Sequence, residues 1–250
     1  VTGAFCKDSR VFVRLFYSVL KWVAIGPWLK LVFRPRVEGA ENVPAEGPAI
    51  LAGNHLSYAD WLFMPLGLPR MVRFVAKAEY FTEPGLKGWF KKTFFSGTGN
   101  VPIDRSGADA AEGALLAAQK VLAEGELFGI YPEGTRSHDG RLYRGKTGVA
   151  RLAHHQGACH PRRGDQDRRG GAAGQGLRPL RAADGPLRQA LDFSRYEGLE
   201  NDRYILRSIT DEIMYEIMKL SGQEYVDMYA NRAKELAKQQ AVEAHDKPAA

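Results

Sequence analysis

Residues 48–60, PAILAGNHLSYAD, are the most informative stretch of the chain because they predict a buried strand joined to a helix through a short polar turn. The small and apolar residues at 48–53 predict the strand, and the mostly apolar stretch at 58–64 predicts a buried helix. On a continuous helix His55 and Asp60 would lie about 140° apart, so a contact between them requires His55 to precede the helix. The segment therefore predicts an imidazole beside a carboxylate at the end of a strand.

This pair of side chains suggests general-base chemistry on a hydroxyl group. A neutral imidazole accepts a proton from an alcohol near pH 7, and a carboxylate fixes its tautomer and stabilises the imidazolium that forms. Two structural alternatives stay open for the same residues. His55 would then be a hydrogen-bonded histidine near the core, and Asp60 would be the acid of a capping box whose N-cap is Ser57.

Strands and helices alternate along the rest of the chain. We expect a short strand and turn at 36–44, strands at 71–76 and 127–131, and helices at 86–95, 108–124, 201–220 and 224–240. This alternation predicts an α/β fold with a largely parallel or mixed sheet flanked by helices. A chain of 250 residues suits one core, and we assign residues 36–250 to a single domain.

The N-terminal region, residues 1–35, predicts an amphipathic helix ahead of this domain. Residues 11–25 are apolar except for a narrow polar stripe, and Gly26-Pro27 is expected to end the helix. The stretch is shorter than the ~20 residues of a spanning helix, and Trp22 and Trp28 favour a position in the bilayer interface. A packed core helix is the alternative. The polar stripe consists of Arg10, Arg14, Ser18 and Lys21.

Residues 154–190 do not fit the alternation. They contain seven glycines and no Ile, Val, Phe, Tyr, Trp or Met, so we expect poor order and no core strand. Their seven arginines and three aspartates supply +4 of the formal net charge of +6, so the overall charge says little about partners. The segment lacks the aromatic residues of a nucleic-acid linker, and no nucleic-acid partner is expected. The abrupt change after Ala153 favours a reading-frame error in the gene.

The cysteines and histidines predict neither a disulfide framework nor a metal site. Two cysteines suit a reducing compartment, and no cleavable signal peptide is recognisable. Four possible zinc ligands fall within seven residues, which is too close for an ordinary site, so no metal is expected. These ligands are His154, His155, Cys159 and His160.

Two further polar segments are candidates for binding an anionic substrate. Residues 97–105, GTGNVPIDR, place Arg105 after a glycine-rich stretch, where a guanidinium suits a phosphate monoester. A surface turn with an ion-paired Arg105 is the alternative. Residues 131–137, YPEGTRS, follow a predicted strand, so their polar side chains emerge at the carboxyl edge of the sheet unless they form an ordinary solvated loop.

Residues 140–147, GRLYRGKT, match the Walker A pattern letter for letter. A phosphate-binding loop should spring directly from a strand, whereas residues 137–139 are turn-like. No apolar strand ending in a Walker B aspartate follows. A P-loop nucleotide enzyme is therefore only a minor alternative.

Taken together, residues 54–60, 99–105 and 131–137 resemble, in order and spacing, the 1-acylglycerol-3-phosphate acyltransferase family of glycerolipid synthesis. The resemblance covers residues 37–153 and resumes near Leu191. The family's fourth motif, an apolar strand with Val-Pro or Ile-Pro, does not appear after Ala158, where the chain reads CHPRR. A noncatalytic, membrane-surface lipid binder is therefore kept as an alternative to an enzyme.

The resemblance implies acyl transfer from a thioester of coenzyme A or acyl carrier protein to the free hydroxyl of a lysophospholipid. The acceptor would be 1-acylglycerol 3-phosphate and the product phosphatidic acid. His55 would be the general base and Asp60 would orient it, without a cofactor. The implied substrate-binding residues are Arg105, Glu133, Gly134, Thr135 and Arg136. Such an enzyme would meet its lipid at the cytoplasmic face of a membrane, as a peripheral or monotopic protein.

Overall fold

The structure of the chain, a computed structural model, describes residues 13–33, 38–104, 110–156, 159–162 and 187–245. Its centre is a four-stranded sheet in the order β2 (Val72–Arg73), β5 (Leu127–Ile130), β1 (Ala49–Gly53) and β7 (Cys159–Arg162). All three strand pairs are parallel, and β1 pairs with β5 from Ala49↔Leu127 to Ala52↔Ile130. This arrangement confirms the predicted α/β class with a parallel sheet.

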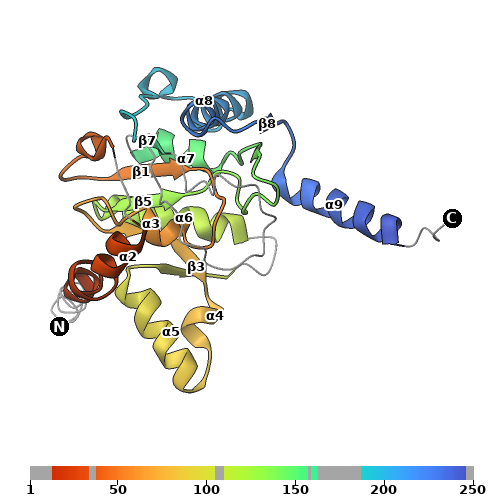
Figure 1. The fold of residues 1–250 in the computed structure, drawn as a ribbon. Coiled ribbons are helices and arrows are strands. Elements are labelled where there is room, and N and C mark those ends of the chain that lie inside the picture. The colour runs from red at the N-terminus through yellow and green to blue at the C-terminus, as the bar shows by residue number, and fades with distance from the viewer. Residues whose placement is uncertain (1–12, 34–37, 105–109, 157–158, 163–186, 246–250) are drawn as a thin grey trace.

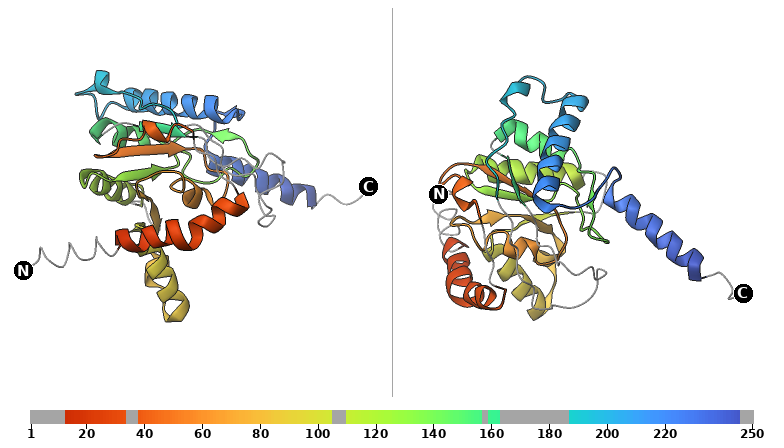
Figure 2. Two further views of the ribbon diagram at one scale, coloured as in Figure 1. Left: turned by 60° about the vertical axis from the view of Figure 1, so that its left-hand side comes forward. Right: turned by 45° about the horizontal axis from the view of Figure 1, so that its top comes forward.

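Helices lie on both sides of the sheet (Figures 1 and 2). One side carries α6 (Ala110–Ala123), α7 (Gly148–Gln156) and α8 (Arg203–Ser221). The other side carries α3 (Asp60–Phe63) and the N-terminal helix. The remaining helical elements are α4 (Glu79–Thr82), α5 (Gly85–Gly97), α9 (Ala230–His245), and the 3-10 turns η2 (Ala40–Asn42) and η3 (Ser194–Tyr196).

β1 is buried along its whole length because both faces of the sheet are covered. Ile50 and Ala52 pack into a large core cluster with side chains of α6, α7 and α8. Ala49 and Leu51 point to the opposite face, as the two-residue period of a strand requires, and pack with Met64 in a second cluster. The apolar run of β1 is therefore typical of a strand buried on both faces.

Two small parallel sheets correct the expected element boundaries. β3 (Val75–Lys77) pairs with β4 (Val101–Ile103), whereas β2 pairs with β5 in the central sheet. The prediction of a single strand at 71–76 is therefore wrong, because this stretch contributes to two sheets. β6 (Leu142–Tyr143) pairs with β8 (Tyr225–Val226), and the helix predicted from residue 224 therefore begins only at Ala230. The described part of the stretch predicted as a strand and turn, 38–44, contains η2 instead of a strand.

The N-terminal helix is longer than predicted. Residues 13–33 are helical throughout, with a π-helical turn η1 (Leu20–Ala24) followed by α2 (Ile25–Phe33). A π-turn accommodates Pro27 without ending the helix. A Cβ on Gly26 would lie 1.6 Å from the Lys21 carbonyl oxygen, so the turn requires glycine there. By length and composition, the 20 residues Val13–Val32 could cross a membrane, which corrects the expectation that the segment is too short.

The prediction that residues 154–190 supply no core strand is also wrong. Cys159 is fully buried and pairs with Ile50 at the start of β7. Pro161 is tolerated because β7 lies at the edge of the four-stranded sheet, where a missing N–H breaks no ladder. Residues 157–158 and 163–186 lie outside the described part of the chain, so the predicted poor order and the reading-frame hypothesis stay untested there.

Candidate active site

The candidate site forms where β1 and β5 end side by side. The two strands are parallel neighbours whose last paired residues are Ala52 and Ile130, so the loops that follow them emerge at the same edge of the sheet. The backbone N–H of His55 donates to Glu133 Oε1 at 3.1 Å, and the N–H of Ser137 donates to the His55 carbonyl at 2.8 Å. The two polar segments predicted separately from the sequence therefore form one site.

His55 lies directly beside Asp60. The distance from His55 Nδ1 to Asp60 Oδ2 is 2.7 Å, and the side chains are 19% and 2% exposed, respectively. An ionised carboxylate only accepts hydrogen bonds, so the contact places the imidazole proton on Nδ1 and the lone pair on Nε2. Nε2 has no hydrogen-bond partner among the described residues. The arrangement therefore leaves a basic nitrogen free for a ligand.

Asp60 also holds the turn that carries His55. Its Oδ2 atom accepts from the backbone N–H groups of Leu56 at 2.8 Å and Ser57 at 3.0 Å. Ser57 Oγ accepts from the Ala59 N–H at 3.1 Å, although the N-cap of the short helix α3 is Ala59 and not Ser57 as expected. The expected capping box therefore does not form, and Asp60 instead binds the imidazole and the backbone of the turn that precedes the helix.

A row of stacked rings fixes the plane of the imidazole. His55 stacks on Tyr131 with ring centroids 4.1 Å apart, and Tyr131 stacks on Phe74 at 5.9 Å. A Cβ on Gly129 would lie 2.2 Å from the Phe74 ring, so this row depends on a glycine within β5. Nothing in the motif pattern had indicated Phe74 or Gly129.

Glu133 is buried beneath the site and links three segments. Its side chain accepts from the backbone N–H groups of His55 and, at 3.0 Å, of Tyr143. Burial and, to a smaller extent, the nearby Asp60 charge raise its pKa to about 7 against the opposing effect of these two hydrogen bonds. Glu133 therefore braces the His55 turn from below and is mostly inaccessible to a ligand, since only 2% of it is exposed.

The same contact disfavours a P-loop in residues 140–147. The middle of this segment forms strand β6, and Glu133 occupies the Tyr143 N–H, a backbone donor that a cradle for phosphate would have to keep free. The match of residues 140–147 to the Walker A pattern therefore does not indicate a nucleotide-binding site.

Cationic side chains gather around the loop after β5. Gly134 has φ +73° and passes close to Lys146, whose Nζ would lie 3.2 Å from a Cβ at this glycine. Lys234 of α9 donates to Thr135 Oγ1 at 2.7 Å, and the guanidinium of Arg136 lies over the Tyr58 ring. Burial and the neighbouring Arg136 charge lower the pKa of Lys234. The cluster is suited to binding an anion.

Nothing in the sequence indicated that Lys234 and Gln223 lie at the candidate site. Lys234 lies 99 residues after Thr135 in an unremarkable amphipathic helix, and Gln223 bonds to Asn54 at 2.6 Å from beyond the end of α8. Arg105, the other predicted phosphate ligand, lies outside the described residues.

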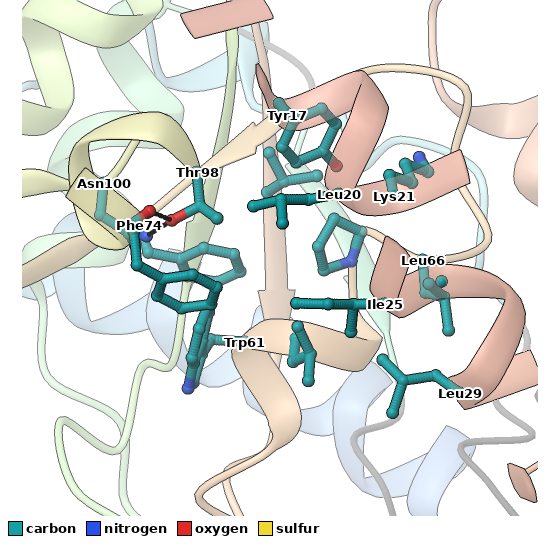
Figure 3. Close-up of a pocket in the computed structure, with 15 residues that line it drawn as sticks. Tyr17, Leu20, Lys21, Ile25, Leu29, Trp61, Leu66, Phe74, Thr98 and Asn100 are labelled. Carbon is teal, nitrogen blue, oxygen red and sulfur yellow. Dashed lines mark hydrogen bonds between the residues drawn. The ribbon is translucent and has the colours of Figure 1, made fainter. Parts of the chain in front are cut away.

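An apolar pocket opens between the N-terminal helix and the body of the protein (Figure 3). Ile25 and Leu29 line one wall, and Trp61 and Phe74 line the other. Trp61 follows Asp60 directly, and Phe74 belongs to the row of rings that ends at His55. The pocket is therefore adjacent to the candidate site through two of its lining residues.

No cluster of three or more metal-ligating side chains occurs within the described residues. His154 is engaged by the Tyr196 carbonyl at 2.7 Å, and Cys159 is a buried free cysteine.

Comparisons with known proteins assign the family. The acyltransferase family model matches residues 34–160, about half of the chain. The chain is 32% identical over 145 residues to the chloroplastic 1-acyl-sn-glycerol-3-phosphate acyltransferase LPAT1 of Arabidopsis thaliana, covering 58% of this chain and 38% of that protein. It is 31% identical over 119 residues to the 1-acyl-sn-glycerol-3-phosphate acyltransferase of Bacillus subtilis strain 168, covering 47% and 56%. The chain belongs to the acyltransferase family, as its motifs predicted.

The fold matches a solved structure over most of its length. The crystal structure of the 1-acyl-sn-glycerophosphate acyltransferase PlsC from Thermotoga maritima superposes with a TM-score of 0.51 at 20% identity, covering 87% of this chain and 84% of that one. The chain spans 38% and 56% of the two curated relatives named above. The comparisons therefore establish the family and the fold.

Proposed function

We propose that this protein transfers an acyl group from a thioester to the free hydroxyl of a lysophospholipid, with 1-acylglycerol 3-phosphate as acceptor and phosphatidic acid as product. The observation that carries the proposal is the 2.7 Å contact between His55 Nδ1 and Asp60 Oδ2, which leaves Nε2 as a base. The choice of acceptor is supported by the similarity to 1-acyl-sn-glycerol-3-phosphate acyltransferases of Arabidopsis thaliana and Bacillus subtilis.

In the proposed reaction His55 Nε2 takes the proton of the acceptor hydroxyl as its oxygen attacks the thioester carbonyl carbon. Asp60 balances the imidazolium that forms. The tetrahedral intermediate then collapses, the carbon–sulfur bond breaks, and the departing thiolate takes the proton from His55. The ester and the free thiol are the products, and no covalent acyl-enzyme, metal or cofactor takes part.

The cations after β5 would bind the phosphate of the acceptor. Lys234 donates to Thr135, and the next residue, Arg136, is close enough to Lys234 for its charge to lower the Lys234 pKa, so a phosphate beside Thr135 would meet two charged donors and a hydroxyl. Gly134 allows the backbone to approach the ligand, and Glu133 holds the loop in place. Arg105 is proposed as a further phosphate ligand on its motif alone. Positioning of this kind supplies much of the rate in a reaction between two bound substrates.

The N-terminal helix and the apolar pocket suit lipid substrates. The helix exposes Trp22, Val23, Trp28 and Leu31, which favours attachment to a bilayer, and we propose the peripheral or monotopic mode at the cytoplasmic face. The pocket between this helix and Trp61 is apolar enough to take part of an acyl chain. The division into an N-terminal interfacial region, residues 1–35, and an acyltransferase domain, residues 36–250, belongs to the same proposal.

A product analysis tests the proposed function. The purified full chain in phosphatidylcholine vesicles is given lysophosphatidate or glycerol 3-phosphate, each with acyl-coenzyme A or with acyl carrier protein thioester, and the lipids are separated by thin-layer chromatography. Phosphatidic acid from lysophosphatidate supports the proposal, and the productive donor identifies the thioester. Binding of lysophosphatidate without transfer from either donor would establish the noncatalytic lipid binder instead.

A further inference from the structure

Helix α5 carries an exposed apolar surface that the candidate site does not use. Leu86, Trp89 and Phe90 are 72%, 57% and 60% exposed, and their spacing of three and four residues places them on one stripe of the helix. The Trp89 and Phe90 rings pack edge to face with centroids 4.9 Å apart. Large apolar side chains that lie together in water indicate a binding surface.

Lysines border this stripe on both sides. At 100° per residue, Lys87 lies about 60° beyond Phe90, and Lys92 lies about 60° beyond Trp89 on the opposite edge. α5 contains three lysines and no acidic residue. Lys91 pairs with Glu83 at 2.5 Å, whereas Lys87 and Lys92 have no ion-pair partner among the described residues. Aromatic rings flanked by unpaired ammonium groups match the surface of an anionic bilayer.

α5 lies beside the N-terminal helix, on the side of the molecule opposite α8 (Figures 1 and 2). The two helices touch, because a Cβ on Gly97 would lie 2.1 Å from the Phe16 ring. The N-terminal helix exposes Trp22 and Trp28, and residues 13–33 contain basic but no acidic side chains. Both helices, which meet at the C-terminal end of α5, therefore carry exposed aromatic rings and basic side chains.

We propose that α5 is a second membrane-binding element, which inserts Leu86, Trp89 and Phe90 into the interface of an anionic bilayer while Lys87 and Lys92 contact lipid head groups. A single interfacial helix leaves the protein free to rotate about the helix axis. A second contact removes this freedom and fixes how the body sits on the surface. The inference rests on the proposed function only in taking the bilayer as the source of the acceptor.

Flotation of the full chain with vesicles tests this proposal without requiring turnover. Phosphatidylcholine vesicles are compared with vesicles that also contain phosphatidylglycerol. Trp89→Gln with Phe90→Gln should lower partitioning into both by about tenfold, since glutamine preserves the helix but buries little apolar area. Lys87→Gln with Lys92→Gln should lower partitioning only into the anionic vesicles, by about fivefold per lysine. The matched control is Tyr204→Gln with Tyr215→Gln, two exposed tyrosines on α8, which should change nothing.

Two results would overturn the proposal. One is unchanged flotation of the Trp89 and Phe90 variant when its circular dichroism matches wild type. The other is wild-type protein that sediments as a dimer and becomes monomeric in this variant, because a second copy of the chain would then cover α5. A protein that floats as expected but transfers no acyl group would refute the proposed function and leave this inference standing.

Discussion

Replacing Asp60 by asparagine removes the charge beside the imidazole while keeping the shape of the side chain. In the structure Asp60 Oδ2 accepts three hydrogen bonds, from His55 Nδ1 and from the N–H groups of Leu56 and Ser57. An amide oxygen at the same place can keep these bonds, but the amide NH₂ then occupies the Oδ1 position, where that buried atom has no partner among the described residues. We expect an unfolding free energy lower by about 1–3 kcal/mol.

The larger effect of this substitution falls on the proposed reaction. A unit charge about 4 Å from an imidazolium stabilises it by about 4 kcal/mol at an effective dielectric constant of about 20. Losing this stabilisation in the transition state corresponds to a kcat about 10³-fold lower. The KM for the acceptor should stay within about threefold, because Asp60 is 2% exposed and its hydrogen bonds go to His55, Leu56 and Ser57 and not to the residues proposed to bind the phosphate.

The assay follows thiol release from acyl-coenzyme A, at saturating lysophosphatidate, by wild type, Asp60→Asn and Ser57→Ala. Ser57→Ala is the matched control because it removes the acceptor of the Ala59 N–H but leaves the carboxylate in place. It should cost about 1 kcal/mol of stability and leave kcat within a few fold. An Asp60→Asn variant that keeps more than about a tenth of the wild-type kcat would refute the charge-balancing role, as would an equal loss in Ser57→Ala.

Three other substitutions test separate parts of the structure. The raised pKa of Glu133, about 7, means that the folded state holds this proton more tightly than the unfolded state, so stability is lost as pH rises from about 4.5 to 7. In denaturant titrations the unfolding free energy of wild type should fall by up to about 3 kcal/mol over this range, and that of Glu133→Gln should not. The same pH dependence of stability in both proteins would contradict the burial argument. Gly26→Ala should destabilise the protein by about 1–3 kcal/mol because its Cβ meets the Lys21 carbonyl. Gly113→Ala in α6, where a Cβ meets nothing, should stabilise it by about 0.5–1 kcal/mol. A melting temperature that is higher for Gly26→Ala than for Gly113→Ala would disprove the requirement for glycine in the π-turn. Lys234→Ala should raise the KM for lysophosphatidate by about tenfold with little change in kcat, while Lys238→Ala, one turn further along α9, should leave both constants alone; equal effects would argue against a specific phosphate contact.

The local parts of this structure were predictable from the sequence. The apolar run before Asn54 predicts β1. His55 and Asp60 are five residues apart, so a single turn between them is enough to bring the two side chains into contact. Both signals are short-range, so a single sequence suffices to identify them.

The features that the sequence did not predict depend on contacts between distant segments of the chain. β6 and β8 have two residues each, and they exist because residues 142–143 and 225–226 meet in space. β7 forms from a sequence with almost no strand propensity because β1 offers an open edge beside it. Lys234 reaches Thr135 only through the position of α9, which no pattern near either residue reveals. Tertiary context overrides local preference in each case.

The proposed role of His55 as the general base is tested by the rate of phosphatidic acid formation by His55→Ala in vesicles that contain lysophosphatidate and acyl-coenzyme A. We expect transfer to fall to the background rate, while lysophosphatidate binding, measured by equilibrium dialysis below the critical micelle concentration, stays within about threefold of wild type. Turnover at the wild-type rate in a correctly folded His55→Ala protein would contradict this role.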